Sequence, residues 1–581
     1  MRNLPVQFLT SFAMAALLAG CAAAPSVSER PVGGSAFAQA AKTPASSRHR
    51  ETLYGNYLAS LHASAQNDTA SAAGYMDRVL ADDPKNPNVL NEVFLYKLGD
   101  GDINGATQLA KKIVLVEPDN QLAAVTLAAD AFSRSDYENA KLLIAKSDRR
   151  GLGALLIPLL SAWAESGLGN TDAALAALAP LSSQKPFLTF QAYHTALIAA
   201  LGKRDDIAEE NFTKTMTMPG GGSLRVTQAY GQFLESRGKH KQAAELYTLT
   251  LDRAPQHPVM IAALARANAG NTSDMLITSA TQGVVETLYG IGSVLSQDER
   301  AGPLPLIYLR LALDMQPDNP VAQTLLAGLL ESLNQWDDAS AVYQDIAKDS
   351  PLYPAAQIQA ALNEENAGRT DNAIAGLRQL HAATPTNQTA TMALADLLRS
   401  NEQYAEAAKA YDTAIAQITS EQPQHWSLYY ARGVCFERLG KWSESERDLH
   451  KALELAPEHP LVLNYLGYSW IDRGENLVKA REMIESAARQ RPRDGFIIDS
   501  LGWALYRGGD YAGAVVALEN AITLRPQDPV INDHLGDAYW RVGRKLEARF
   551  QWRRALTFKP EPALVRIIEN KLEAGPDYKV P

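Results

Sequence analysis

The sequence predicts an all-α fold that is built from short helix-turn-helix units. Prolines recur at nearly constant intervals, apolar residues recur at three- and four-residue spacing between them, and small residues recur at matching places in each interval. A spacing of three and four residues places side chains on one face of an α-helix. Together these patterns predict paired amphipathic helices that repeat along the chain.

The prolines give the period of the repeat. In the second half of the chain the steps between them are 34, 34, 38, 34, 35, 34 and 34, at Pro317, Pro351, Pro385, Pro423, Pro457, Pro492, Pro526 and Pro560. The first half has the same period, with a step of 68 between the second and third prolines, at Pro84, Pro118, Pro186, Pro219 and Pro255. Proline lacks an N–H and restricts the residue before it, so each proline is expected to follow the end of a helix.

The residues between the prolines repeat as well. One interval reads Leu501, Gly502, Leu505, Gly509, Tyr511, Ala514, Leu518, Ala521 and Pro526. The next interval, 34 residues later, reads Leu535, Gly536, Tyr539, Gly543, Lys545, Ala548, Trp552, Ala555 and Pro560. We expect Gly502 and Ala514 where two helices cross closely, and Gly509 in a left-handed turn that ends the first helix. A single pair cannot bury both of its faces, so the pairs must stack.

This pattern resembles the tetratricopeptide repeat (TPR) family. The resemblance implies a right-handed α-α superhelix, a TPR solenoid of about fourteen helix-turn-helix repeats in which the first helix of each pair lines the concave face. We expect an N-terminal arm over residues 51–256, a C-terminal arm over 305–560, and a capping helix and tail over 561–581.

The repeat loses its phase between the two arms. Pro255 and Pro317 are 62 residues apart, six short of two repeats, and Asn271-Thr272-Ser273 interrupts a helical pattern. We interpret residues 257–304 as a degenerate repeat and junction. It forms either a bend between two arms or a decayed repeat that still packs in line.

The N-terminus has the features of a targeting segment. Residues 1–20 are expected to be a signal peptide, because Arg2 precedes the apolar stretch 8–18, which is too short to span a membrane. Leu18-Ala19-Gly20-Cys21 resembles the lipobox of bacterial lipoprotein precursors, which implies lipidation at Cys21. The alternative is an ordinary signal peptide with a chance cysteine. Residues 21–50 then form the lipidated cysteine and a flexible linker, rich in Ala, Ser, Pro and Gly.

Several function classes do not fit the sequence. The net charge is −10 and no block of lysine and arginine stands out, so nucleic acid is not an expected partner. We find no phosphate-binding loop, zinc-protease or serine-hydrolase motif. His425, His450 and His459 lack metal-ligand spacing. We therefore expect no enzyme activity, no cofactor, no metal and no small-molecule substrate. Cys435 lies in an apolar helical pattern and is expected to be buried.

Binding is expected on the first helices of the C-terminal repeats. The side chains predicted to face the groove are Tyr430, Arg438, Asn464, Tyr468, Asp499, Trp503, Tyr506, Arg507, Asp533, Asp537, Trp540 and Arg541. Aromatic residues beside arginine and aspartate are typical of protein-binding surfaces. The alternative is that some of these aromatics belong to the core, as we expect for Trp470 and Trp552.

The best-known TPR groove grips a C-terminal carboxylate with lysines and asparagines. This sequence has Asn464 but carries Asp499 and Asp533 in the equivalent positions. The resemblance therefore implies a different ligand mode, such as a helix in the groove or a folded partner.

The region from Leu466 to Pro560 also resembles the long periplasmic TPR lipoproteins of Gram-negative bacteria. This implies a non-enzymatic scaffold or adaptor that is lipid-anchored through Cys21 and binds one or more periplasmic or envelope proteins. One role within that group is to present peptidoglycan hydrolases to a carboxyl-terminal processing protease. The alternative is an assembly factor for an outer-membrane export or polysaccharide apparatus. Ala22 is not the aspartate that marks inner-membrane retention in enteric bacteria, so we expect the periplasmic face of the outer membrane.

Cys21→Ser is expected to release the protein from membranes, because the thiol that accepts the lipid is lost. Each buried methylene contributes about 0.8 kcal/mol to anchoring. Fractionation of cells into membrane and soluble parts measures the effect, with Cys435→Ser as the control. Membrane retention of the Cys21→Ser variant contradicts lipid anchoring.

Overall fold

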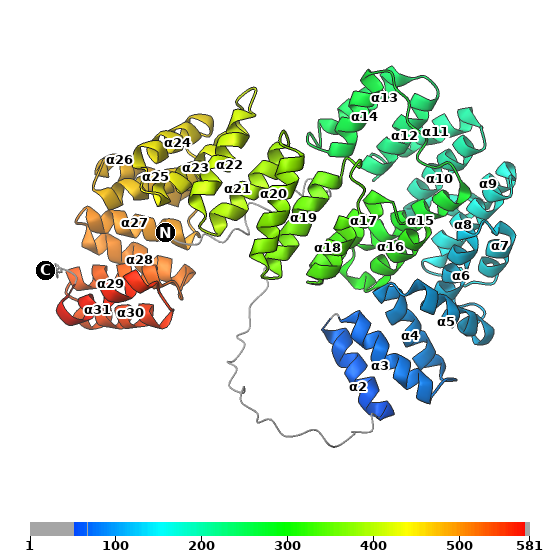
Figure 1. Cartoon of the computed structure of the whole chain (residues 1–581), viewed down its shortest axis with the longest axis horizontal. Helices are drawn as coiled ribbons and strands as arrows, with labels where there is room; N and C mark the ends of the chain where they lie inside the picture. Colours follow the sequence, from blue (N-terminus) through cyan, green and yellow to red (C-terminus); the bar gives the residue numbers. More distant parts are fainter. Residues whose placement is uncertain (1–51, 67, 576–581) are drawn as a thin grey trace. The chain divides into compact units, whose positions relative to one another are not determined.

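The structure is a computed structural model that describes residues 52–66 and 68–575. The expected signal peptide, Cys21, the linker and the last part of the tail lie outside these residues. The described residues form thirty α-helices and four short 3-10 helices, without any strand (Figure 1). The predicted all-α fold of paired helices is therefore confirmed. The described residues divide into two compact units, the first ending at residue 376 and the second beginning at residue 377.

The first unit is a series of helices of 7 to 16 residues. Its helices are α2 (Leu53–Ala65), α3 (Thr69–Asp82), α4 (Pro87–Asp100), α5 (Ile103–Val116), α6 (Gln121–Ser133), α7 (Tyr137–Ala145), α8 (Gly153–Gly167), α9 (Thr171–Ala177), α10 (Leu188–Leu201), α11 (Asp205–Met216), α12 (Leu224–Ser236), α13 (His240–Leu251), α14 (Pro258–Asn268), α15 (Ala280–Leu295), α16 (Leu304–Met315), α17 (Pro320–Ser332), α18 (Trp336–Gln344) and α19 (Tyr353–Asn366). The 3-10 helices here are η2 (Ala179–Ser183), η3 (Lys185–Phe187) and η4 (Glu299–Ala301).

The second unit continues the helix pairs to the end of the described chain. Helix α20 (Thr370–Ala383) begins in the first unit and ends in the second. The remaining helices are α21 (Gln388–Ser400), α22 (Tyr404–Ala416), η5 (Pro423–His425), α23 (Trp426–Arg438), α24 (Trp442–Leu455), α25 (Pro460–Arg473), α26 (Leu477–Gln490), α27 (Gly495–Arg507), α28 (Tyr511–Leu524), α29 (Pro529–Arg541), α30 (Lys545–Thr557) and α31 (Pro562–Ala574).

A residue with a left-handed backbone closes the turn inside each of the regular pairs. Gly509 and Gly543 have φ angles of +84°, as the repeat pattern predicts. Two turns of the same register, at Asn334 and Glu402, have a non-glycine residue with φ +60°. The turn geometry is thus kept even where glycine is absent, because the repeat length and the packing of the two helices impose it.

Small residues sit where the two helices of a pair cross. A Cβ on Gly502 would lie 2.5 Å from Cγ of Leu518, and one on Gly536 would lie 2.4 Å from Nε1 of Trp552. Trp552 is fully buried in the last pair, and Trp470 is equally enclosed in an earlier one. Both tryptophans therefore belong to the core, as expected.

The segment expected as a junction, residues 257–304, packs deep within the first unit. Helix α15 contacts α6, α8 and α10, and α16 contacts α4, α5 and α6. The Thr281 hydroxyl donates to the backbone carbonyl of Phe132 at 2.9 Å, across 149 residues of sequence. A Cβ on Gly283 would lie 2.3 Å from the ring of Trp163. The division between the two compact units falls later, after residue 376.

Glu402→Gly is expected to stabilise the second unit by about 1 kcal/mol. A non-glycine residue in the left-handed region costs roughly 1–3 kcal/mol, and the extra freedom of glycine in the unfolded chain offsets part of that gain. Urea unfolding monitored by circular dichroism measures the change. Gly509→Ala is the matched reverse substitution and should destabilise the same unit by about 1 kcal/mol. A Glu402→Gly variant that is less stable than the parent would show that the side chain has a role the turn geometry does not reveal.

Candidate functional site

The predicted groove residues lie on α23, α25, α27 and α29, the first helices of four successive pairs. On α23, Tyr430 is buried, with its ring centroid 5.8 Å from that of Trp426. Burial raises the pKa of Tyr430 to about 12. Arg438 is partly exposed, with Nε 3.5 Å from a carboxylate oxygen of Glu437. Tyr430 therefore contributes to the interior rather than to an open surface.

On α25 the two predicted residues differ in exposure. Asn464 is buried and its Oδ1 has no hydrogen-bond partner. Tyr468 is partly buried. Burial raises the pKa of Tyr468 well above its ordinary value, and the negative charges of Asp472 and Asp499 add to that shift. Both side chains thus lie under the surface or at its edge.

Helices α27 and α29 contribute a cluster of stacked rings, and Asp472 of α25 accepts a hydrogen bond from it. The Trp503 ring lies 4.9 Å from the Tyr506 ring and 4.1 Å from the His534 imidazole, nearly parallel to both. The Trp503 indole N–H donates to Oδ1 of Asp472 at 3.4 Å. These contacts fix the orientation of the indole while leaving it partly exposed.

Two arginines border these rings. Arg541 Nε donates to the Tyr506 hydroxyl at 3.2 Å. Nη1 of Arg507 lies 4.0 Å from Oδ1 of Asp472. Both arginines are exposed. We call the four residues Trp503, Tyr506, Arg507 and Arg541 the aromatic ledge. It brings together four of the residues predicted for the groove.

Asp499 is not part of this exposed surface. It is buried, and its two carboxylate oxygens lie 2.9 and 3.1 Å from Nδ1 of His534. Burial lowers the pKa of His534, but the Asp499 carboxylate, together with Asp533 and Asp537, more than offsets that effect, so the pKa lies above its ordinary value. The Asp499–His534 pair therefore joins α27 to α29 inside the stack.

Asp533 and Asp537 are buried around a lysine of the last helix. Lys571 Nζ on α31 lies 2.7 Å from Oδ2 of Asp533 and 2.8 Å from Oδ2 of Asp537. The indole N–H of Trp552 donates to the other oxygen of Asp537 at 3.1 Å. Burial and the neighbouring Asp533 raise the pKa of Asp537 to about 6, and the ammonium group only partly counters them. These acids thus hold the final helix instead of lining an open groove.

Trp540 is packed near the end of the chain. Its ring centroid lies 5.4 Å from that of Trp552, and the Lys545 ammonium lies 4.9 Å from the Trp540 ring centroid. A Cβ on Gly575 would lie 2.7 Å from Cζ2 of Trp540. Trp540 is therefore held mainly by internal contacts and does not belong to the aromatic ledge.

The sequence did not single out His534, Lys571 or Asp472, which complete these contacts. The repeat pattern identifies which helix positions recur. However, it does not show that a lysine in the final helix faces two aspartates 34 and 38 residues earlier. The available signal was Lys571, a basic residue outside the repeat pattern that follows the recurring acids Asp499 and Asp533.

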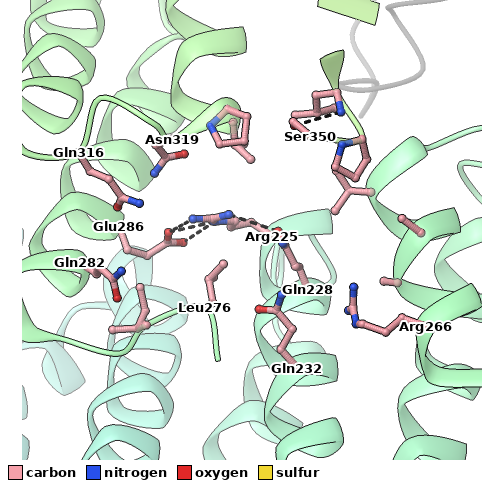
Figure 2. A pocket seen from close by; sticks show the side chains of 18 residues that line it. Arg225, Gln228, Gln232, Arg266, Leu276, Gln282, Glu286, Gln316, Asn319 and Ser350 are labelled. Atoms are coloured by element: carbon pink, nitrogen blue, oxygen red, sulfur yellow. Dashed lines mark hydrogen bonds and ion pairs between the residues drawn. The ribbon is translucent and has the colours of Figure 1, made fainter. Parts of the chain in front are cut away.

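The first unit contains a cavity of about 280 Å³ that the sequence did not predict. Helices α12, α14, α15 and α17 and the loop after α14 contribute its walls (Figure 2). Figure 2 shows the Arg225 side chain and the Glu286 carboxylate meeting across the cavity, with Gln232 and Arg266 below them. Arg225 Nη2 lies 2.7 Å from Oε2 of Glu286.

Two further kinds of feature, a metal cluster and a membrane-spanning helix, are absent from the described part of the chain. Among those residues there is no cluster of three or more histidine, cysteine or acidic side chains placed to hold a metal ion. No helix within residues 52–66 and 68–575 combines the length and apolar character needed to cross a bilayer.

Family comparisons locate known repeats in the second half of the chain. A model described as TPR repeat matches residues 502–543, and a tetratricopeptide repeat model matches residues 358–423, 392–449 and 430–495. These segments are similar to tetratricopeptide repeats. All four residues of the aromatic ledge lie within the match to 502–543.

One curated relative and several solved structures are similar to parts of the chain. The TPR repeat-containing protein PA4667 of Pseudomonas aeruginosa is 32% identical over 149 residues, which cover 26% of this chain and 25% of that protein. The chain thus matches about a quarter of the relative's length. The APC/C hetero-tetramer Cut9–Hcn1 is 15% identical with a TM-score of 0.38, covering 90% of this chain and 96% of that one. Yeast Tom70 is 14% identical with a TM-score of 0.29, covering 90% and 95%.

Lys571→Met is expected to destabilise the second unit by about 3 kcal/mol at pH 8, because it leaves two buried carboxylates without their cation. The folded-state pKa of Asp537 is raised to about 6 from an ordinary value of 3.8. The stability that its protonation contributes is therefore fully present below pH 3.8 and is lost as the pH rises through 6. The loss in Lys571→Met should therefore be smaller at pH 5 than at pH 8.

Denaturant unfolding at the two pH values measures this difference. Arg566→Met replaces an exposed cation on the same helix and serves as the control. Equal destabilisation by Lys571→Met at pH 5 and pH 8 would mean that the two aspartates do not govern the effect.

Proposed function

We propose that the chain is a non-enzymatic scaffold that binds segments of partner proteins on the aromatic ledge. The single observation that carries this proposal is the partly exposed Trp503–Tyr506 stack bordered by exposed Arg507 and Arg541. Tryptophan, tyrosine and arginine dominate the energetics of protein interfaces. The location of the ledge within tetratricopeptide repeats supports the same function.

The charges at the ledge favour a particular kind of segment. The buried acids of α27 and α29 are compensated internally by His534 and Lys571. Arg507 and Arg541 are exposed at the ledge, and the Asp472 side chain, 57% exposed, lies 4.0 Å from Arg507. A partner segment with one apolar side chain and one carboxylate therefore fits: the apolar group covers the indole, and the carboxylate pairs with a guanidinium.

We further propose that the scaffold acts in the bacterial envelope, lipid-anchored through Cys21 on the periplasmic face of the outer membrane. The lipobox-like Leu18-Ala19-Gly20-Cys21 supports this placement. The sharpest form of the proposal is an adaptor that presents peptidoglycan hydrolases to a carboxyl-terminal processing protease. Co-purification from detergent-solubilised envelope after mild crosslinking tests it. Recovery of outer-membrane transport components instead would favour a role in export or polysaccharide assembly.

Trp503→Ala is expected to weaken binding of the co-purified partner by about 30-fold, equivalent to about 2 kcal/mol at an interface hot spot. Helicity should remain intact, because the indole is partly exposed and lies at the edge of the stack. Titration of the purified partner, together with circular dichroism, measures both effects.

Trp540→Ala is the matched comparison. Because Trp540 is held by Trp552 and the chain near Gly575, its loss should lower stability more than the loss of Trp503 does. The double variant should combine the two effects. Unchanged partner affinity in Trp503→Ala, or loss of the fold in that variant, would refute the assignment of the ledge as a binding surface.

A further inference from the structure

The cavity of the first unit is electrically balanced. Arg225 is paired with the buried Glu286, with Nε 2.9 Å and Nη2 2.7 Å from Oε2. Arg266 is paired with the buried Glu235, with Nε 3.0 Å from Oε2 and Nη2 3.1 Å from Oε1. Each guanidinium is thus neutralised by its own carboxylate. A charged ligand would have to compete with these pairs, so a neutral ligand is favoured.

Carboxamide groups supply most of the remaining polar lining. Gln228, Gln232, Gln282, Gln316 and Asn319 all contribute to the wall. A carboxamide offers both a donor and an acceptor, as a peptide group does. The oxygens of Gln228, Gln282 and Asn319 already accept hydrogen bonds within the protein, so these side chains offer their amide N–H groups, which match the carbonyls of a polypeptide backbone.

Gln232 provides a specific indication of a missing partner. The residue is 8% exposed, its Nε2 donates to the Ser273 hydroxyl at 3.3 Å, and its Oε1 is buried without any hydrogen-bond partner. A buried acceptor left without a partner costs roughly 1–3 kcal/mol. Figure 2 places this carboxamide at the cavity, below Arg225 and Gln228. A ligand N–H that reached Oε1 would remove that cost.

The other part of the wall is apolar. Val259, Ala262, Leu276, Ile277, Val321 and Leu352 contribute to it. No aromatic ring is among the lining residues of this cavity, so a sugar would find no flat face to stack on. The volume of about 280 Å³ accommodates one large apolar side chain and the groups next to it.

The position of the cavity explains why it stays open. Helix α15 contacts α6, α8 and α10, and it also lines the cavity together with α12, α14 and α17. Gln228, Val259, Ala262, Gln282 and Val321 are each partly exposed, so the cavity reaches solvent. The lining residues of α12, α14, α15 and α17 are thus accessible to a ligand from solvent.

We propose that this cavity binds a neutral stretch of extended polypeptide from a partner protein, consisting of one apolar side chain and its two flanking peptide groups. The side chain contacts the Leu276–Ile277 wall, and a backbone N–H donates to Oε1 of Gln232. The site lies entirely in the first unit and does not depend on the aromatic ledge. It would give the scaffold a second peptide-binding site of different chemistry.

The minimal probe is N-acetyl-leucine N-methylamide, which carries one apolar side chain between two peptide groups. Methyl NMR of the full chain, labelled at isoleucine δ1 methyls, should show a saturable shift of the Ile277 signal. A ligand of this size is expected to have a dissociation constant on the order of 1 mM. Absence of a saturable Ile277 shift up to about 10 mM would overturn the proposal.

Two variants test the site itself. Ala262→Phe fills the cavity and should abolish the Ile277 response, whereas Ala265→Phe, at an exposed position of the same helix, should leave it unchanged. Gln232→Leu should weaken the probe at least about fivefold, because it removes the Oε1 acceptor. The same change removes the hydrogen bond from Nε2 to the Ser273 hydroxyl, so thermal unfolding of the variant is measured beside binding to show that the fold is kept. Unchanged affinity in Gln232→Leu and Ala262→Phe would contradict the assignment.

Competing ligands separate the remaining outcomes. A saturable Ile277 response to phosphate or acetate in place of the neutral probe would mean an anion site, and a stronger response to N-acetylglucosamine would mean a sugar site. Either result overturns the proposal. Trp503→Ala should leave the Ile277 response intact, and Ala262→Phe should leave binding at the aromatic ledge intact. Failure of one site is therefore distinguishable from failure of the other.

Discussion

The structure depends on one constraint, which is that a single amphipathic helix pair cannot bury its own apolar surface. Stacking satisfies this constraint only when successive pairs have nearly the same length and a similar turn. Left-handed residues such as Gly509 and Glu402 maintain the turn, and small residues such as Gly536 allow the two helices to approach. Sequence periodicity and packing are thus two consequences of the same requirement.

Much of the fold could be predicted from the sequence because the repeat depends on local, recurring residues. The helix pairs, the turn at Gly509, the close crossing at Gly502 and the buried Trp552 all follow from the 34-residue pattern. The packing of α15 against α6 and α8 could not be predicted, since it joins segments that belong to no common repeat. Periodicity carries no information about such a contact.

The candidate site was predicted less completely, for a related reason. A repeat position shows that a side chain lies on the first helix, but not whether another group already occupies the space beside it. Asp533 and Asp537 share the helix face with Trp540, yet Lys571 engages both carboxylates. Trp503 and Arg541 instead remain at the surface. The sequence therefore could not show which charged residues are buried, because the partner of the two aspartates, Lys571, lies outside the repeat pattern.

The contact between Thr281 and Phe132 changes how the first unit assembles. In an array in which each repeat touches only its neighbours, folding can begin anywhere and spread. Here the hydrogen bond spans 149 residues, so closing that loop requires a long intervening segment to be ordered. Until α15 packs against α8, Trp163 lacks its close contact with Gly283. The first unit is therefore expected to fold as one cooperative block, and more slowly than a simple array of the same length.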